Sequence, residues 1–147
     1  MNHELPDLDA VQDLGAAIAE RLKPGDVVAL SGGLGAGKTT LARAIIAALG
    51  HKEEVPSPTF TIIETYASPP LRLPVVHADF YRLETPDEAL EIGLDEYRDG
   101  AALIAEWPEL AEGFEGEAAC LSVTLEIVGQ GRRAIVEPGI DWVERLP

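Results

Sequence analysis

The chain has 147 residues, of which 26 are acidic and 11 basic, and its formal charge at neutral pH is −15. This excess of negative charge opposes a large independent contact with a nucleic-acid backbone, so we expect any nucleic acid to be held by another subunit. The length and the 46% hydrophobic content predict a single domain, residues 1–147, that buries a sizeable core.

The N-terminus and the cysteine content bear on the compartment. Residues 1–7 lack the basic start and apolar stretch of a leader, and no apolar segment approaches the ~18 residues of a membrane span. Cys120 is the only cysteine. It forms no internal disulfide, and we expect a buried thiol in a reducing compartment. These features predict a soluble, cytoplasmic protein with no membrane partner.

The first predicted element is a helix that begins after Asp7, which is placed to cap it, and ends before Pro24. Apolar or small residues recur at helical spacing along one face: Leu8, Val11, Gly15, Ile18 and Leu22. We expect this face to pack on a sheet.

Residues 31–40 carry the strongest motif. The run Gly-Gly-Leu-Gly-Ala-Gly-Lys-Thr at 32–39 fills the pattern G-x-x-x-x-G-K-[ST] of a phosphate-binding loop. The apolar run 27–30 before it is typical of a buried parallel strand, and helical spacing follows it as far as Gly50. Strand, loop and helix in this order predict a nucleotide site.

The motif suits a polyphosphate, whose concentrated charge is held best by converging backbone N–H groups. Lys38 is expected to reach the β and γ oxygens, and the Thr39 hydroxyl to ligate Mg²⁺. The residues expected to contact the nucleotide here are Gly33, Gly35, Ala36, Gly37, Lys38, Thr39 and Thr40.

A stiff loop is predicted after the helix, because Pro56 and Pro58 exclude both a helix and a central strand. It exposes the hydroxyls of Ser57 and Thr59. The loop is placed either like a switch segment that senses a γ-phosphate or as an ordinary connection into the next strand, at 60–66.

Two apolar strands each lead to an acid: residues 75–79 end at Asp79, and residues 101–105 precede Glu106. The carboxyl ends of parallel strands open at the ligand crevice, where a magnesium nucleotide needs a carboxylate opposite the threonine of the loop. The two acids therefore compete for the magnesium role, or share it between the ion and its water shell. His77 shares a face with Asp79, and we expect a packed, hydrogen-bonded histidine.

A short helix is predicted between these strands, at residues 85–93, and a hairpin ends the chain. Alternation over 121–127, a turn at 129–132 and the run 134–136 predict two antiparallel strands. Arg132 and Arg133 either approach a nucleotide or lie on a surface turn. The whole pattern predicts an α/β fold, a P-loop NTPase-like three-layer sandwich whose mixed sheet carries a C-terminal antiparallel hairpin.

Four motifs, in this order and spacing, resemble those of the bacterial TsaE family: residues 32–40, Ser-Pro-Thr-Phe at 57–60, His-Ala-Asp-Phe-Tyr-Arg-Leu at 77–83, and Glu-Trp-Pro-Glu at 106–109. The resemblance covers nearly the whole chain. It implies a small ATPase that uses ATP and Mg²⁺ in threonylcarbamoyladenosine formation on tRNA. It also implies work with a TsaD-like transferase and a TsaB-like partner, low activity without them, and tRNA reached only through the complex.

The resemblance further implies roles for individual residues. These are Lys38 on the phosphates, Thr39 on Mg²⁺, Ser57 and Thr59 in the switch-like loop, Asp79 as the Walker B-like acid, Glu106 as a second magnesium or water ligand, Trp107 as its neighbour, and Gly131 and Arg132 near the nucleotide. From residue type alone, Trp107 is expected to be a core aromatic.

A phosphate loop fixes a phosphate binder and not a reaction. A GTPase is disfavoured, because Asn2 is the only asparagine and cannot supply an N-K-x-D motif. A small-molecule kinase remains the enzymatic alternative, although arginines for a closing lid are sparse. The third alternative is a nucleotide-gated binding module with little turnover.

Overall fold

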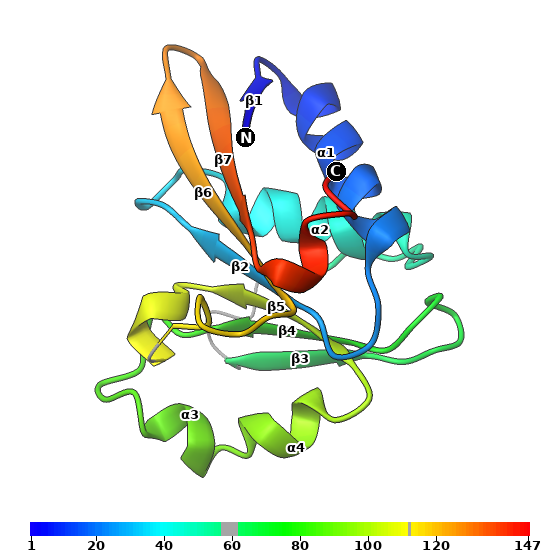
Figure 1. Cartoon of the computed structure of the whole chain (residues 1–147), viewed down its shortest axis with the longest axis vertical. Coiled ribbons are helices and arrows are strands. Elements are labelled where there is room, and N and C mark those ends of the chain that lie inside the picture. Colours follow the sequence, from blue (N-terminus) through cyan, green and yellow to red (C-terminus); the bar gives the residue numbers. More distant parts are fainter. Residues whose placement is uncertain (57–61, 112) are drawn as a thin grey trace.

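A computed structural model describes residues 1–56, 62–111 and 113–147 of the chain (Figure 1). Ser57 and Thr59, predicted to form the switch-like loop, lie outside the described residues. In the described part, the strands form one mixed sheet in the order β1-β7-β6-β2-β5-β4-β3. No helix in that part is both long enough and apolar enough to cross a bilayer.

The elements have these bounds. The strands are β1 (Asn2–Leu5), β2 (Val27–Ser31), β3 (Ile63–Tyr66), β4 (Val75–Asp79), β5 (Ala102–Glu106), β6 (Cys120–Val128) and β7 (Gly131–Pro138). The α-helices are α1 (Leu8–Arg21), α2 (Lys38–Ala48), α3 (Glu88–Glu91) and α4 (Leu94–Arg98), and the short 3₁₀ helices are η1 (Pro108–Ala111) and η2 (Ile140–Trp142).

Helices cover both faces of the sheet, which makes the predicted three-layer sandwich (Figure 1). Val28 and Leu30 of β2 face α1 and α2, whereas Val27 and Ala29 face the side on which α4 packs through Leu94. Strands β2, β5 and β4 run parallel and are buried on both faces. Their unbroken apolar sequences follow from this double burial.

The edges of the sheet are antiparallel. β6 runs parallel to β2 and then pairs with β7 in the predicted hairpin, and β3 pairs antiparallel with β4 on the other side. β1 was not predicted. It has only four residues, and it forms by pairing Asn2 with Ile135 at the far end of the chain.

Helix α1 begins as predicted, with the Asp7 carboxylate accepting a hydrogen bond from the Ala10 N–H at 2.9 Å. The predicted buried face is wrong at one position, because Leu8 is 56% exposed. As the first residue of the helix, Leu8 lies away from the core and borders surface hollows instead.

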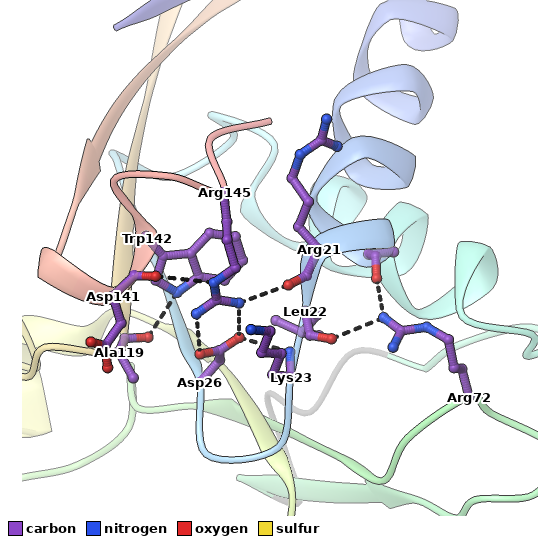
Figure 2. A network of polar contacts seen from close by, with 10 residues as sticks. Arg21, Leu22, Lys23, Asp26, Arg72, Ala119, Asp141, Trp142 and Arg145 are labelled. Atoms are coloured by element: carbon purple, nitrogen blue, oxygen red, sulfur yellow. Dashed lines mark hydrogen bonds and ion pairs between the residues drawn. The ribbon is translucent and has the colours of Figure 1, made fainter.

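The C-terminal segment closes the N-terminal end of β2 (Figure 2). Arg145 donates to both carboxylate oxygens of the buried Asp26, at 2.8 and 2.9 Å, and its guanidinium lies over the ring of Trp142. The Trp142 indole N–H in turn donates to the carbonyl oxygen of Ala119 at 2.9 Å. This network ties η2 to the sheet at the end opposite the glycine-rich loop.

Arg145→Ala is expected to lower the free energy of unfolding by about 2 kcal/mol, because it leaves Asp26 buried without its cation. Breaking a fully buried pair costs about 3–5 kcal/mol, and the Arg145 side chain is 14% exposed, which reduces the effect. Urea denaturation measures it. The control is Arg133→Ala, which breaks the exposed pair with Glu4 and should cost little stability, because water screens an exposed ion pair. Equal losses in the two variants would contradict this role of the buried pair.

Candidate functional site

The loop after β2 follows a path that requires glycine at two positions. Gly32 has a φ of 140°, and a Cβ there would lie 2.5 Å from the carbonyl oxygen of Leu125 on β6. Gly37, directly before α2, has a φ of 102°, in the left-handed region. A larger residue would clash at the first position and be strained at both. The motif therefore sets the shape of the loop, and its glycines place no side chain between the backbone and a ligand.

Lys38 begins α2 and folds back over the loop. Its Nζ donates to the carbonyl oxygens of Gly32 and Gly33, at 2.8 and 2.9 Å, and lies 4.2 Å from the centre of the Trp107 ring. An ammonium group has three donor hydrogens, so one remains for a further partner. Burial lowers the pKa of Lys38, while the nearby carboxylates, Glu106 first, oppose the shift. Lys38 therefore stabilises the loop and places a positive charge in the lining of the adjoining hollow.

The two predicted acids stand side by side. Asp79 and Glu106 are register partners on the parallel strands β4 and β5, so they lie on the same face, toward α2. Glu106 Oε1 accepts a hydrogen bond from the Thr39 hydroxyl at 2.6 Å. Asp79 Oδ1 accepts one from the backbone N–H of Tyr81 at 3.0 Å. It is Glu106 that is in direct contact with the threonine of the loop.

His77 is fully buried on β4, with its Nε2 2.6 Å from Oε2 of Glu106. The expectation of a packed, hydrogen-bonded histidine is confirmed. Its partner is a second site residue, which the sequence did not indicate.

Arg132 reaches the loop from β7. Its guanidinium donates to the carbonyl oxygens of Ala36 and Gly35, at 3.2 and 3.1 Å. Arg133, the next residue, pairs instead with Glu4 on β1 at the surface. The sequence did not decide whether Arg132 or Arg133 approaches the nucleotide site. In the structure Arg132 contacts the loop, and Arg133 lies at the surface.

Trp107 borders the site and only packs against the edge of the core, so the expectation of a core aromatic from residue type alone is only partly right. It is half-buried directly after β5, and its ring lies 4.9 Å from that of Tyr81, between centres. Together with the Lys38 contact, this makes Trp107 one wall of the crevice.

Two hollows share the loop. The larger, of about 420 Å³, has a lining that includes Lys38, Thr39, Asp79, Glu106, Trp107 and Arg132. The smaller, of about 210 Å³, lies between the start of α1 and the β6–β7 turn, and its lining includes Leu5, Leu8, Val11, Thr40, Leu125 and Arg132. A hollow rich in charged side chains therefore adjoins a more apolar one, whose lining also includes Asp7 and Gln130, and Gly37, Thr40 and Arg132 line both.

Comparison of the sequence with known protein families identifies the family of this chain. A family model described as "Threonylcarbamoyl adenosine biosynthesis protein TsaE" matches residues 5–135, well over half of the chain. The chain belongs to the TsaE family. The resemblance seen in its four motifs is thereby confirmed, and with it a P-loop, ATPase-like class of protein.

Individual TsaE proteins match over most of the chain. A protein of Rickettsia conorii named tRNA threonylcarbamoyladenosine biosynthesis protein TsaE is 38% identical over 132 residues, which cover 89% of this chain and 74% of that protein. The Bacillus subtilis protein of the same name is 47% identical over 104 residues, 70% of this chain and 61% of that protein. A crystal structure of Bacillus subtilis YdiB superimposes with a TM-score of 0.78 at 29% identity, covering 99% of this chain and 90% of that one.

Sequence reasoning missed two features of this TsaE site. The apolar hollow is built by Leu5 and Val11, from neighbouring elements at the N-terminus, and by Leu125 from β6 near the other end of the chain, and no local pattern connects these two parts. The bond between His77 and Glu106 had a weak signal, since both residues lie at or near the ends of apolar strands. Predicting this bond would have required knowing that β4 and β5 are neighbours in the sheet.

Proposed function

We propose that this protein binds ATP with Mg²⁺ and hydrolyses it, as the ATPase component of the machinery that forms threonylcarbamoyladenosine on tRNA. The observation that carries the proposal is that Lys38, Thr39 and Glu106 line one hollow at the glycine-rich loop, with Lys38 bonded to the loop and Thr39 to Glu106. The family, whose members are named for this tRNA modification, supplies the pathway. The ATPase unit is the whole chain, residues 1–147.

The triphosphate occupies the larger hollow. The amides of residues 33–40 and the positive N-terminal end of α2 attract the phosphates, and Lys38 gives its remaining donor hydrogen to them. A buried cation held in place by two carbonyl oxygens needs no reorganisation when charge develops on the γ-phosphate.

The donor set beside the loop suits magnesium, which takes hard oxygen ligands and combines one or two carboxylates with substrate phosphates. Thr39 and Glu106 would hold the ion, since their side chains already meet, and Asp79, one strand further from β2, would orient the attacking water. When bound, magnesium neutralises the charge that develops on the β and γ oxygens. Asp79 would then direct the water toward the γ-phosphate while Glu106 and Thr39 held the ion.

The nucleoside occupies the smaller hollow. Its apolar lining from Leu5, Val11 and Leu125 suits the faces of a base, and it opens beside Gly37 and Thr40, where the phosphate chain begins. Gly131 and Arg132 close one side of it. This arrangement supports ATP as a whole, and not a bare phosphate, as the ligand.

The partners are a TsaD-like transferase and a TsaB-like protein in the cytoplasm, and tRNA is reached only through their complex. The charge of −15 supports this indirect contact, because the protein by itself repels a phosphate backbone.

Phosphate release from ATP, measured with and without the TsaB–TsaD pair and tRNA, tests the function. We expect slow release by the protein alone and faster release with the partners. Strong turnover without them, with a small molecule becoming phosphorylated, would instead identify a kinase. Tight binding with no turnover in either condition would identify a nucleotide-gated binding module.

Arg132→Ala is expected to weaken ATP binding by about 10-fold, which corresponds to about 1.4 kcal/mol, because the loop loses two braces at Gly35 and Ala36 and a nearby cation. Isothermal titration calorimetry measures the affinity. The matched control is Arg133→Ala, the same substitution one residue later at the surface, and an equal loss there would refute a specific role for Arg132.

A further inference from the structure

We propose that His77 is the positioning residue of this site, and that it holds Glu106 in the one orientation in which the carboxylate serves Thr39 and the metal. The inference rests on the proposed function and adds to it a residue with no expected contact with the nucleotide.

The Glu106 carboxylate divides its two oxygens between two partners. Oε1 accepts from the Thr39 hydroxyl and Oε2 lies against His77 Nε2, each at 2.6 Å. These are the hydrogen bonds to the Glu106 side chain among the residues that the structure describes. The pair of contacts fixes the rotation of the carboxylate as well as its place.

His77 itself is held rigidly. β4 pairs with β5 on one side and β3 on the other, and every residue of the strand is buried. Glu106 is 2% exposed and His77 is not exposed at all. An ionised carboxylate only accepts hydrogen bonds, so the ring places its Nε2–H toward Glu106.

The second ring nitrogen of His77, Nδ1, shows that packing alone does not explain why a histidine occupies this position. Among residues 1–56, 62–111 and 113–147, Nδ1 of His77 has no hydrogen-bond partner. A buried polar atom without a partner is unfavourable, and an aliphatic residue would fill the same space without one. The described hydrogen bond of the ring is the one to Glu106, which makes that bond the reason for a histidine here.

The contact matters most when the metal binds. Thr39 lies in the first turn of α2, directly after the loop, and its hydroxyl would leave Glu106 if it held magnesium instead. The His77 contact comes from the sheet and does not involve the loop. It would therefore keep Glu106 oriented while Thr39 held the ion. Groups that orient metal ligands in this way commonly raise metal affinity.

Three substitutions at one position test the inference. The amide nitrogen of glutamine reaches the place of Nε2, that of asparagine reaches only the place of Nδ1, and leucine offers no donor. ATP affinity is measured for each variant with Mg²⁺ and with EDTA, by the fluorescence of Trp107 beside the loop. Val75→Ala, on the same face of β4 and away from Glu106, is the control for a loss of packing.

We expect His77→Leu and His77→Asn to lose about 10- to 100-fold of the affinity that Mg²⁺ adds. His77→Gln should stay within about 3-fold of wild type, because it restores the donor. The affinity in EDTA should be unchanged in all three, and Val75→Ala should respond to Mg²⁺ as wild type does. A wild-type response in both His77→Leu and His77→Asn, or an equal loss in His77→Gln, would overturn the positioning role and leave the proposed function intact. A wild-type protein that does not bind ATP would overturn both.

A measurement on the unaltered protein guards against variants that do not fold. The chain has three histidines, so the imidazole nitrogens can be assigned by ¹H–¹⁵N correlation NMR. We expect His77 to carry a slowly exchanging proton on Nε2. A ring protonated on Nδ1 alone would overturn the inference.

Discussion

Lys38→Ala is expected to bind ATP about 1000-fold more weakly than wild type, whether or not Mg²⁺ is present. A unit charge about 4 Å from a phosphate oxygen, at an effective dielectric constant of about 20, contributes about 4 kcal/mol, or roughly three powers of ten in affinity. The variant also loses both contacts that brace the loop at Gly32 and Gly33, so the amides are less well placed. Isothermal titration calorimetry in Mg²⁺ and in EDTA gives both affinities.

The control for Lys38→Ala is Lys52→Ala. Lys52 is exposed after the end of α2, so its substitution changes the net charge by the same amount away from the loop. Wild-type affinity is expected there. If Lys38→Ala bound ATP as tightly as Lys52→Ala does, the loop would not be the phosphate site.

Glu106→Ala is expected to bind ATP as wild type does in EDTA, yet to release phosphate at least about 100-fold more slowly in Mg²⁺. The phosphate loop and Lys38 remain, which preserves the metal-free affinity. The carboxylate that meets Thr39 is gone, so the metal and its water are no longer held in line. Single-turnover phosphate release with the TsaB-like and TsaD-like partners measures the rate.

Glu109→Ala is the control for Glu106→Ala. Glu109 is exposed in η1, three residues further along the chain. Its charge also acts on Lys38, but its side chain does not line the crevice, so the variant removes the same charge without removing a crevice group. We expect near wild-type turnover. Equal rates for Glu106→Ala and wild type would assign the reaction to other groups, Asp79 first.

The sequence predicted the features that depend on neighbours in the chain. The loop, the strand before it and the helix after it follow from residues 27–50, and the hairpin follows from the alternation over 121–127. The acids at Asp79 and Glu106 also follow, because strand ends are visible as the ends of apolar runs. Their exposure to a common crevice needed only the rule that parallel strands share an edge.

The features that were not predicted depend on strand order. β1 forms because β7 offers it an edge, and Asp26 becomes buried because Arg145 returns to it from the far end of the chain. Arg132 and Arg133 illustrate the limit most simply. Successive residues of a strand point to opposite faces, and only the packed sheet determines which of the two arginines reaches the loop.

A crystal structure with Mg²⁺ and a non-hydrolysable ATP analogue tests the central claim most directly. The account predicts electron density for the triphosphate against the amides of residues 33–40, with the metal between Thr39 and Glu106 and the base in the hollow beside Val11 and Leu125. An empty loop at saturating nucleotide, or an analogue bound elsewhere on the protein, would contradict it.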